Sequence, residues 1–316
     1  MPHVLKTVGE GYCFEFSFFT LHLHYKNTKK LFAFYCVSVK ICVMGKFNDK
    51  RVLITGGASG IGRLMGAMAL EKGAAALIIW DINQANIDST VAQYAPKGRV
   101  VGYRVDVSDD KAVAEAYSRV KSEIGGVDIL INCAGIITSN KTFDRCTTDE
   151  IHRTMAINAV APMVVALQVL PDMVARNSGH ICNIASAGGM ISNPKMSIYA
   201  ASKWAAIGWS DSVRIELEQM KSKVKITTIA PYYITTGMFD GVKSRVIPLL
   251  KPEYAARQII RAIEKEKRLK VLMRWIPVPH HFIRLMQGLL PTRFFDWLFG
   301  QVFGIYHTMD NFTGRR

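Results

Sequence analysis

Short apolar runs alternate with amphipathic segments between residues 51 and 273. The apolar runs predict β-strands at 51–55, 76–80, 99–105, 128–132, 180–185, 225–230 and 270–273. The amphipathic segments between them predict helices near 61–72, 84–94, 109–123, 149–176, 198–220 and 253–266. This alternation is typical of an α/β protein with a doubly wound parallel sheet that helices cover on both faces. Such sheets place their ligand crevice at the carboxyl ends of the strands.

The two ends of the chain depart from this pattern. Residues 1–43 hold nine of the 31 aromatic residues, but they show no Ala-x-Ala-like cleavage site, and Lys40 ends their longest apolar run. They therefore predict neither a signal peptide nor a spanning helix. Two interpretations stay open, an over-extended translation start and a loosely folded arm that contacts a membrane. We expect an atypical extension at 1–43, one α/β domain at 44–274 and a basic, aromatic extension at 275–316.

Composition and charge narrow the class of protein. The chain has 316 residues, is 49% hydrophobic and carries a net charge of +15, and both flanks contribute to the basic excess. No nucleic-acid-binding motif accompanies the charge, so an anionic lipid surface and an ordinary basic surface are the two interpretations that remain. No run of about 18 uncharged apolar residues predicts a spanning helix.

Cysteine and histidine spacing argues against metal or disulfide chemistry. The six cysteines lack Cys-x-x-Cys spacing and the eight histidines lack paired ligand spacing. We expect reduced thiols in a cytoplasmic protein, surface histidines and no metal site.

One glycine-rich turn predicts a dinucleotide site. The segment Thr55-Gly56-Gly57-Ala58-Ser59-Gly60-Ile61-Gly62 follows a predicted strand and opens a predicted helix. Its glycines let the backbone approach a pyrophosphate, to which the helix N-terminus offers unpaired N–H groups.

Asp81 predicts which dinucleotide would bind. It ends the second strand, 19 residues beyond Gly62, where a carboxylate can accept hydrogen bonds from the adenosine ribose and would repel a 2′-phosphate. No Arg or Lys stands at Ser59, Ile82 or Asn83 to bind that phosphate. NAD is therefore favoured over NADP, with a helix N-cap role for Asp81 as the alternative.

A tyrosine and a lysine one helical turn apart predict proton transfer. Tyr-x-x-x-Lys spacing occurs at Tyr25 with Lys29, Tyr117 with Lys121, and Tyr199 with Lys203. Only the third pair has a serine, Ser186, thirteen residues upstream at the end of a strand. A phenol of pKa about 10 is a poor base near neutrality, so a neighbouring lysine that lowers the pKa would make it usable.

Further positions complete a resemblance that covers about residues 48–264. Asp106 follows the third strand, Asn132-Cys133-Ala134-Gly135 follows the fourth, and Asn158 lies in the next predicted helix. Together with the glycine turn and with Ser186, Tyr199 and Lys203, they resemble the short-chain dehydrogenase/reductase family. The resemblance implies a Rossmann fold and an enzyme that transfers hydride between NAD and a CH–OH group.

The resemblance also assigns roles. Tyr199 would be the acid/base, Ser186 would orient the substrate oxygen, Lys203 would lower the phenol pKa and hold the nicotinamide ribose, and Asn158 would anchor a water that relays the proton. The residues that the resemblance and the glycine turn place around the cofactor are Gly56, Ser59, Gly60, Ile61, Gly62, Asp81, Ile82, Asp106, Val107, Asn132, Ala134, Gly135, Tyr199, Lys203, Pro231, Ile234 and Thr236. This sequence departs from the family at Cys133, where a second Asn is usual, and at Tyr232, where Gly usually follows the proline.

Apolar residues near the predicted site favour an apolar alcohol or ketone as substrate, although the same residues could be core. A predicted lid comprises Met238, Phe239, Val242, Val246, Ile247, Leu249 and Leu250, and the opposite wall comprises Met190, Ile191 and Met196.

Three alternative functions stay open: a silent NAD-binding sensor or scaffold, a dehydrogenase of small polar alcohols, and a sugar-nucleotide epimerase. The resemblance also implies a homodimer or homotetramer that pairs through 149–176 and 198–220.

The extension from Trp275 onward is too apolar for a solvated helix. Its apolar positions are Phe282, Ile283, Leu285, Met286, Leu289, Leu290, Phe294, Phe295, Trp297, Leu298, Phe299, Val302 and Phe303, with Arg284 and Arg293 among them. Peripheral contact with a lipid interface explains this pattern, and so does packing over the site or against a second subunit. We favour the lipid interface, because the extension resembles the branch of the family that oxidises retinol, hydroxysteroids and other lipid alcohols at membranes.

Overall fold

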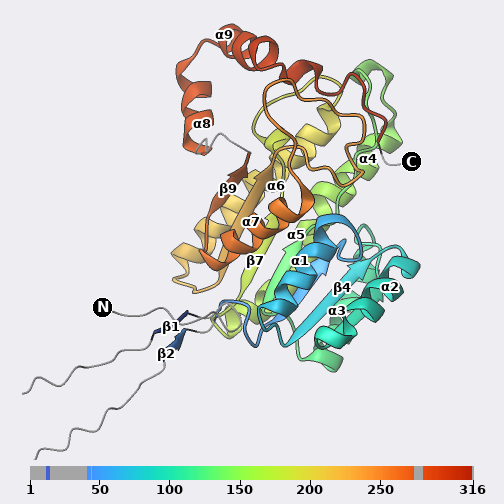
Figure 1. Cartoon of the computed structure of the whole chain (residues 1–316), viewed down its shortest axis with the longest axis vertical. Helices are drawn as coiled ribbons and strands as arrows, with labels where there is room; N and C mark the ends of the chain where they lie inside the picture. Colours follow the sequence, from blue (N-terminus) through green and yellow to red (C-terminus); the bar gives the residue numbers. More distant parts are fainter. Residues whose placement is uncertain (1–11, 15–40, 44, 274–279, 315–316) are drawn as a thin grey trace, which may run out of the picture.

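The computed structural model describes residues 12–14, 41–43, 45–273 and 280–314, and its main feature is a seven-stranded parallel sheet (Figure 1). The strands lie in the order β5-β4-β3-β6-β7-β8-β9. Their bounds are β3 Arg51–Thr55, β4 Ala76–Asp81, β5 Val100–Arg104, β6 Ile129–Asn132, β7 His180–Ile184, β8 Lys225–Pro231 and β9 Leu269–Leu272. The strand order reverses between β3 and β6, and the crevice expected of a doubly wound sheet lies beyond their carboxyl ends.

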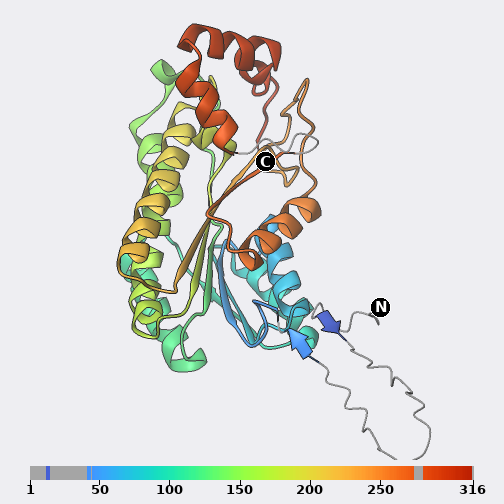
Figure 2. The same ribbon diagram turned by 90° about the vertical axis from the view of Figure 1, so that its left-hand side faces the viewer.

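Helices cover both faces of the sheet, as the two views show (Figure 2). One layer comprises α1 Gly60–Glu71, α2 Gln84–Tyr94 and α7 Pro252–Glu264. The other comprises α3 Asp110–Ile124, α5 Ala161–Ala175 and α6 Ser197–Gln219. Val52 and Ile54 pack into the first layer and Leu53 into the second, all fully buried. Because both faces are buried, the strands are almost entirely apolar and do not alternate with polar residues.

The predicted helix at 149–176 is interrupted in the structure. It comprises α4 Thr148–Met155, a π-helical turn Ala156–Val160, and α5. Thr147 and Glu150 form a capping box at its start. The π turn carries Asn158, whose side chain is only 1% exposed. Single π turns within helices are frequent at functional sites.

The same helix has the length and composition to cross a membrane. Within the described part of the chain, Thr148–Ala175 is the one helix that meets this criterion, and 44% of the qualifying window is buried. Val165, Ala166 and Val169 pack it against the sheet. Its buried face belongs to the core of the domain, and one helix of this length and composition is weak evidence for a membrane span.

Only parts of the two extensions are described. In the first, β1 Tyr12–Phe14 pairs with β2 Ile41–Val43 in an antiparallel ladder. In the second, Trp275 lies outside the described residues, and the chain continues through α8 His280–Leu289, α9 Thr292–Asp296, a π turn Trp297–Val302 and a 3₁₀ turn Ile305–His307.

The C-terminal extension packs onto the domain. Ile283, Phe295 and Ile305 are buried in one cluster with Met190 and Ile207. The Gln287 amide also donates a hydrogen bond of 2.6 Å to the Met190 carbonyl. The extension therefore contributes core, which is the packing alternative left open by its sequence.

One histidine departs from the expectation of surface positions. His180 at the start of β7 is 7% exposed, and its Nε2 lies 2.8 Å from Thr227 Oγ1. Burial lowers the pKa of His180 to about 4, so the ring is neutral near pH 7.

Candidate active site

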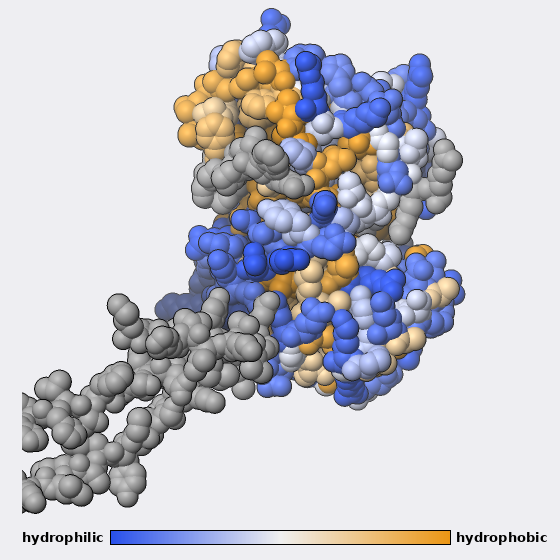
Figure 3. Space-filling view, viewed as in Figure 1, coloured by the Kyte–Doolittle hydropathy of each residue, from blue (hydrophilic) through white to orange (hydrophobic). Residues whose placement is uncertain are grey.

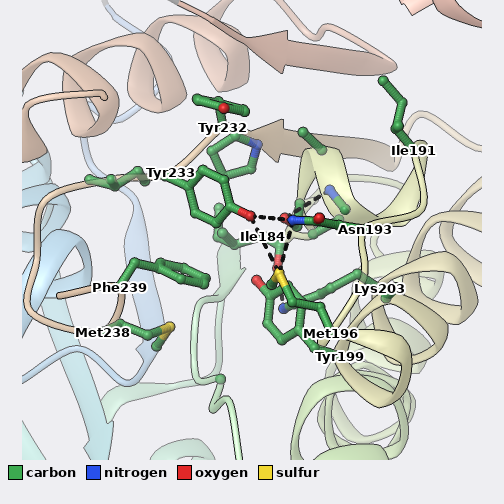
Figure 4. Close-up of a pocket in the computed structure, with 18 of the residues that line it drawn as sticks. Ile184, Ile191, Asn193, Met196, Tyr199, Lys203, Tyr232, Tyr233, Met238 and Phe239 are labelled. Carbon is green, nitrogen blue, oxygen red and sulfur yellow. Dashed lines mark hydrogen bonds between the residues drawn. The ribbon is translucent and has the colours of Figure 1, made fainter. Parts of the chain in front are cut away.

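A cavity opens at the carboxyl ends of the central strands. Its empty volume is about 1000 Å³, including space open to solvent. Ser186, Tyr199 and Lys203 line it together with the segment after β8. Figure 4 shows Tyr199 and Lys203 opposite Tyr232 and Tyr233 of that segment. The topology thus brings to one place three of the four catalytic candidates.

Tyr199 and Lys203 lie one turn apart on α6. The Tyr199 side chain is 6% exposed, and its ring meets Phe239 edge-on at 5.9 Å between centroids. Lys203 Nζ lies 5.7 Å from the centroid of the Tyr199 ring and donates a hydrogen bond of 3.0 Å to the Ile184 carbonyl. This bond holds the ammonium group at the end of β7.

Ser186 follows β7 and starts a 3₁₀ turn. Its Oγ accepts a hydrogen bond of 3.1 Å from the Gly188 N–H. While the oxygen accepts from the backbone, the hydroxyl can donate its own proton to an oxygen in the cavity, as it does to the Tyr199 hydroxyl.

Asn158 is buried in the π turn next to Ser202 and Gly135. Its Oδ1 accepts from the Ile136 N–H and its Nδ2 donates to the Ile136 carbonyl, both at 2.8 Å. Nδ2 also lies 3.2 Å from Ser202 Oγ, next to Lys203 on α6. A Cβ at Gly135 would lie 3.3 Å from Asn158 Oδ1 and 3.6 Å from Lys203 Nζ, so both groups surround this glycine. Sequence reasoning missed Ser202, which binds Asn158 and has only its position before Lys203 as a signal.

Burial shifts the pKa values of Tyr199 and Lys203 in opposite directions. Burial raises the pKa of Tyr199 to about 12, while a hydrogen bond with Ser186 lowers it in part. Burial lowers the pKa of Lys203 to about 8. In the protein alone, burial thus shifts the phenol pKa in the direction opposite to the one expected from Lys203. Both groups are held nearer to their neutral forms than in water.

The glycine turn has the conformation of a phosphate cradle. Gly56 has φ +64°, and a Cβ there would lie 3.0 Å from Ala134 Cα. A Cβ at Gly62 would lie 2.2 Å from the Gly56 carbonyl oxygen, so only glycine fits. The N-cap residue of α1, Ser59, makes no side-chain capping bond, which leaves the first N–H groups of the helix available to an anion. These residues fit a dinucleotide.

Asp81 lies at the end of β4 beside this turn. Its Oδ2 accepts from the Ala58 N–H and its Oδ1 from the Asn83 N–H, both at 3.1 Å. The N-cap of α2 is Asn83, which accepts from the Asn86 N–H at 3.0 Å. The alternative that Asp81 serves as the helix cap is therefore wrong.

The other cofactor candidates lie around the same crevice. Asp106 Oδ1 accepts from the Ser108 N–H at 2.9 Å and orders the turn that contains Val107. Asn132 is buried, and its Nδ2 donates to Asn183 Oδ1 at 2.9 Å across β6 and β7. Thr55 Oγ1 accepts from the N–H groups of Cys133 and Ala134 at 3.0 and 3.2 Å. These bonds join the ends of β3, β6 and β7 where the cofactor is expected.

The segment after β8 lines the cavity opposite Tyr199. Pro231, the last residue of β8, lines it with Ile234 and Thr236, and a Cβ at Gly60 of the glycine turn would lie 3.8 Å from Thr236 Cβ. Tyr232, at the unusual position, is buried and its hydroxyl lies 2.9 Å from Ser244 Oγ. Cys133, the other departure, lines the cavity, and burial raises its pKa to about 12, so it stays a thiol.

The predicted lid divides between cavity and core. Met238 and Phe239 line the cavity, whereas Ile247 and Leu250 pack into the core with α7. On the opposite wall, Ile191 and Met196 line the cavity and Met190 packs against the C-terminal extension.

Sequence reasoning missed several residues of this wall. Asn193, Tyr233 and Ile305 line the cavity and come from three separate segments. No local pattern relates these segments, and proximity to the Tyr199 motif was the only signal for Asn193.

Comparisons with known proteins agree with this geometry. The family model for short chain dehydrogenases matches residues 50–246. The chain is 37% identical to epidermal retinol dehydrogenase 2 of Mus musculus over 271 residues, which cover 84% of this chain and 85% of that protein. It is 34% identical to human estradiol 17-beta-dehydrogenase 11 over 246 residues, covering 77% and 80%.

A solved structure shows the same fold. Levodione reductase superimposes with a TM-score of 0.64 at 23% identity, covering 72% of this chain and 97% of that chain. The retinol and estradiol dehydrogenases place the chain within one branch of a large family. The chain therefore belongs to the short-chain dehydrogenase/reductase family, as an oxidoreductase that acts on CH–OH groups with a nicotinamide cofactor.

Proposed function

We propose that this protein interconverts an apolar alcohol of retinol or steroid type and its carbonyl compound, with NAD as the cofactor. The observation that carries the proposal is the cavity itself. Tyr199, Lys203 and Ser186 meet in it, and apolar side chains such as Met238 and Phe239 line it around them. Relatives named for retinol and estradiol support the same class of substrate.

The proposed chemistry uses one proton and one hydride. The nicotinamide, when bound, supplies or accepts the hydride. Tyr199 takes the hydroxyl proton during oxidation and returns it during reduction. Ser186 donates a hydrogen bond to the same oxygen, since its O–H stays available while its oxygen accepts from the Gly188 N–H. Lys203, held at the Ile184 carbonyl, places a positive charge near the phenol and favours its ionised form.

Asn158 has a supporting part in this proposal. Its amide is occupied by Ile136 and Ser202, so the side chain holds the π turn in place beside Lys203. A relay water would then bind to groups that this turn positions, and the proton would leave through Lys203.

The preference for NAD rests on Asp81. A carboxylate beside the Ala58 N–H suits ribose hydroxyls and repels a 2′-phosphate. Arg104, on the neighbouring strand β5, pairs with Asp81 in the sheet, and its Nε donates a hydrogen bond of 3.3 Å to the Ile82 carbonyl. We expect the Asp81 carboxylate to decide the choice between NAD and NADP, because the Arg104 guanidinium is bonded to the backbone.

A substrate panel tests the function. Purified enzyme with NAD is offered all-trans-retinol, estradiol and short polar alcohols, and NADH formation is followed. We expect turnover with an apolar alcohol and little with the polar ones. Turnover confined to polar alcohols would favour a small-alcohol dehydrogenase, and NADH binding without any turnover would favour a sensor or scaffold.

We also propose that the C-terminal extension contacts a lipid surface. Its outer face exposes Phe282, Leu285, Leu289, Phe294, Trp297 and Val302. Figure 3 shows a hydrophobic surface at the end of the molecule that α8 and α9 form. Burial contributes about 25 cal/mol per Å² of apolar area, and each cation near an anionic surface adds about 1 kcal/mol. A few such residues with Arg284 and Arg293 suffice for reversible binding.

Point variants test this contact better than truncation, because Phe295 and Ile305 are core. We expect the full chain to co-sediment with anionic liposomes and the triple variant Leu285→Asp, Leu289→Asp, Trp297→Asp to stay in solution. The control variant Met220→Asp, Tyr254→Asp changes exposed apolar residues elsewhere and should sediment normally. Equal sedimentation of all three proteins would contradict the proposal.

Pairing of two copies through α5 and α6 is a further part of the proposal. Leu167 on α5 and Trp204 on α6 are 68% and 47% exposed, which suits a face that a second copy covers. Sedimentation velocity of the wild type and of Leu167→Glu tests it, and we expect the variant to sediment as a smaller species.

A further inference from the structure

Thr308 in the C-terminal extension joins separate parts of the chain that surround the cavity. It follows the 3₁₀ turn Ile305–His307 and is only 1% exposed. Thr308 is not among the described residues that line the cavity. Any effect of Thr308 on a substrate therefore passes through the residues to which it is bonded.

The Thr308 hydroxyl connects two residues of the cavity wall. It donates to the Ile305 carbonyl at 2.8 Å, which leaves its oxygen to accept. Asn193 Nδ2 donates to that oxygen at 3.0 Å, and the Tyr233 hydroxyl lies 3.1 Å from it. Asn193 and Tyr233 line the cavity and also bond each other at 2.8 Å, as Figure 4 shows. One hydroxyl of the extension thus joins the loop before α6 to the segment after β8.

The backbone from Thr308 onward is bonded to the predicted lid. The Lys243 N–H donates to the Thr308 carbonyl at 3.3 Å. Farther along the extension, the N–H groups of Thr313 and Gly314 donate to the Asp240 carbonyl at 2.9 and 3.3 Å. The extension therefore holds both the wall and the lid of the cavity, and Thr308 takes part in both contacts.

The proton-transfer groups are held by other bonds. Lys203 donates to the Ile184 carbonyl, and Ser186 accepts from the Gly188 N–H. Neither bond involves the extension, so a change at Thr308 should alter the wall and the lid while these groups stay in place. An interaction that serves the ground state and the transition state equally affects KM and leaves kcat unchanged.

We propose that Thr308 is a positioning residue for substrate binding. Its hydroxyl fixes Asn193 and Tyr233 in the wall, and its carbonyl fixes the lid. Substrate affinity then depends on the C-terminal extension as well as on the segment after β8. This inference rests on the proposed function, because it requires that the substrate binds against this wall.

Two substitutions separate the hydroxyl from the methyl group of Thr308. Thr308→Val keeps the shape and removes the hydroxyl, whereas Thr308→Ser keeps the hydroxyl. The substrate is all-trans-retinol or estradiol, whichever the purified enzyme oxidises with NAD. We expect KM to rise about 2- to 12-fold in Thr308→Val, the range of one net hydrogen bond, with little change in kcat or in NADH affinity. Thr308→Ser should restore the wild-type KM, and Thr292→Val, at an exposed threonine of the same extension, should not alter it.

Two glycines test the contact between the lid and the extension independently. Gly237 and Gly241 have similar positive φ angles of +87° and +81°. A Cβ at Gly241 would lie 2.0 Å from the Asn311 carbonyl oxygen in the extension, whereas one at Gly237 would meet its nearest neighbour, Asp240 Oδ2, at 3.8 Å. The two alanine variants share the backbone strain, so we expect the larger rise in KM in Gly241→Ala.

The outcomes of these measurements are distinct. A wild-type KM in Thr308→Val, or a loss confined to kcat, would overturn the inference while alcohol oxidation stands. A raised KM that Thr308→Ser does not restore would assign the effect to the methyl group, and this too would overturn it. If Thr308→Val does not fold, an equal KM in Gly241→Ala and Gly237→Ala would overturn the inference.

If no alcohol is oxidised, the proposed function fails, and limited proteolysis then tests the inference. Lys243 is exposed in the lid, and Lys111 is exposed in the first turn of α3. Trypsin cleavage after Lys243, measured relative to cleavage after Lys111, should be faster in Thr308→Val than in the wild type and in Thr308→Ser, because cleavage follows local opening. The same relative rate in all three proteins would show that Thr308 does not hold the lid.

Discussion

Replacing Tyr199 by Phe removes one oxygen from the cavity and little else. We expect turnover to fall about 100- to 10,000-fold, the usual value of a general acid–base group. This corresponds to about 3–5 kcal/mol added to the barrier. The loss should appear in kcat, because the proton transfer is made only in the transition state.

The structure indicates that the fold will tolerate this change. The ring keeps its edge contact with Phe239 and its place beneath Lys203 Nζ. The hydroxyl loses its hydrogen bond with Ser186, worth about 1 kcal/mol, and Tm should fall by only about 2–4 °C. NADH affinity should change little, because Lys203 stays at the Ile184 carbonyl.

Tyr117 provides a matched control with the same spacing to a lysine. Its hydroxyl donates to Asp172 at 2.6 Å on the α3 side of the sheet, away from the cavity. Tyr117→Phe should cost stability and leave kcat unchanged. Steady-state rates, NADH fluorescence titration and thermal unfolding are measured for both variants. Retention of half the rate by Tyr199→Phe, or an equal loss in Tyr117→Phe, would refute the assignment.

Three further predictions concern the cofactor site and acid stability. Wild-type kcat/KM should favour NAD over NADP, and Asp81→Ala should narrow that gap; equal use of both cofactors by the wild type would remove Asp81 from the ribose site. Gly62→Ala places a Cβ 2.2 Å from the Gly56 oxygen and should weaken NADH binding at least about tenfold, whereas Gly208→Ala, with nothing within 4 Å, should not; calorimetric titration decides. His180 takes up a proton at about 6.5 when unfolded and only at about 4 when folded, so stability present above pH 6.5 is lost as pH falls towards 4, by up to about 3 kcal/mol. Urea unfolding of His180→Gln should show a flatter pH dependence over that window, and an unchanged profile would assign the loss elsewhere.

The sheet could be predicted from the sequence because its strands are buried on both faces. β3 matches its predicted bounds, and β5, predicted over 99–105, is Val100–Arg104. Apolar runs flanked by polar turns leave little freedom in where such strands begin and end. The place of the catalytic candidates could be predicted from the parallel strand arrangement, since Ser186 and the loop after β8 lie at the carboxyl ends of neighbouring strands.

The interruption of the long helix was not predicted, although Pro162 lies within the predicted span and has no N–H to bond the Asn158 carbonyl four residues earlier. Residues 156–160 contain neither Gly nor Pro, and their apolar pattern is continuous with the segments on either side. The π turn coincides with the tertiary bonds of Asn158 to Ile136, which lies 22 residues away in sequence. A periodicity argument contains no information about such a bond. His180 escaped prediction for the same reason, because its partner Thr227 is on another strand.

The C-terminal extension shows how one amphipathic pattern can have two partners. Its sequence indicates an apolar face but not what covers it. In the structure, Ile283, Phe295 and Ile305 face the domain, while Leu289 and Trp297 face outward. Ile305 also lines the cavity, and Thr308 holds Tyr233 on the cavity wall.

The segment that would contact lipid is thus continuous with a wall of the cavity. Trp297 and Ile305 are separated by only a π turn and the start of a 3₁₀ turn. Tyr233 and Phe239 line the same cavity as Tyr199, and Phe239 meets the other two rings edge to face at 5.1 and 5.9 Å between centroids. On the proposal that this extension contacts lipid, an apolar substrate would pass from the lipid to a wall that is itself apolar, and burial of its apolar area there would offset part of the lost lipid contact.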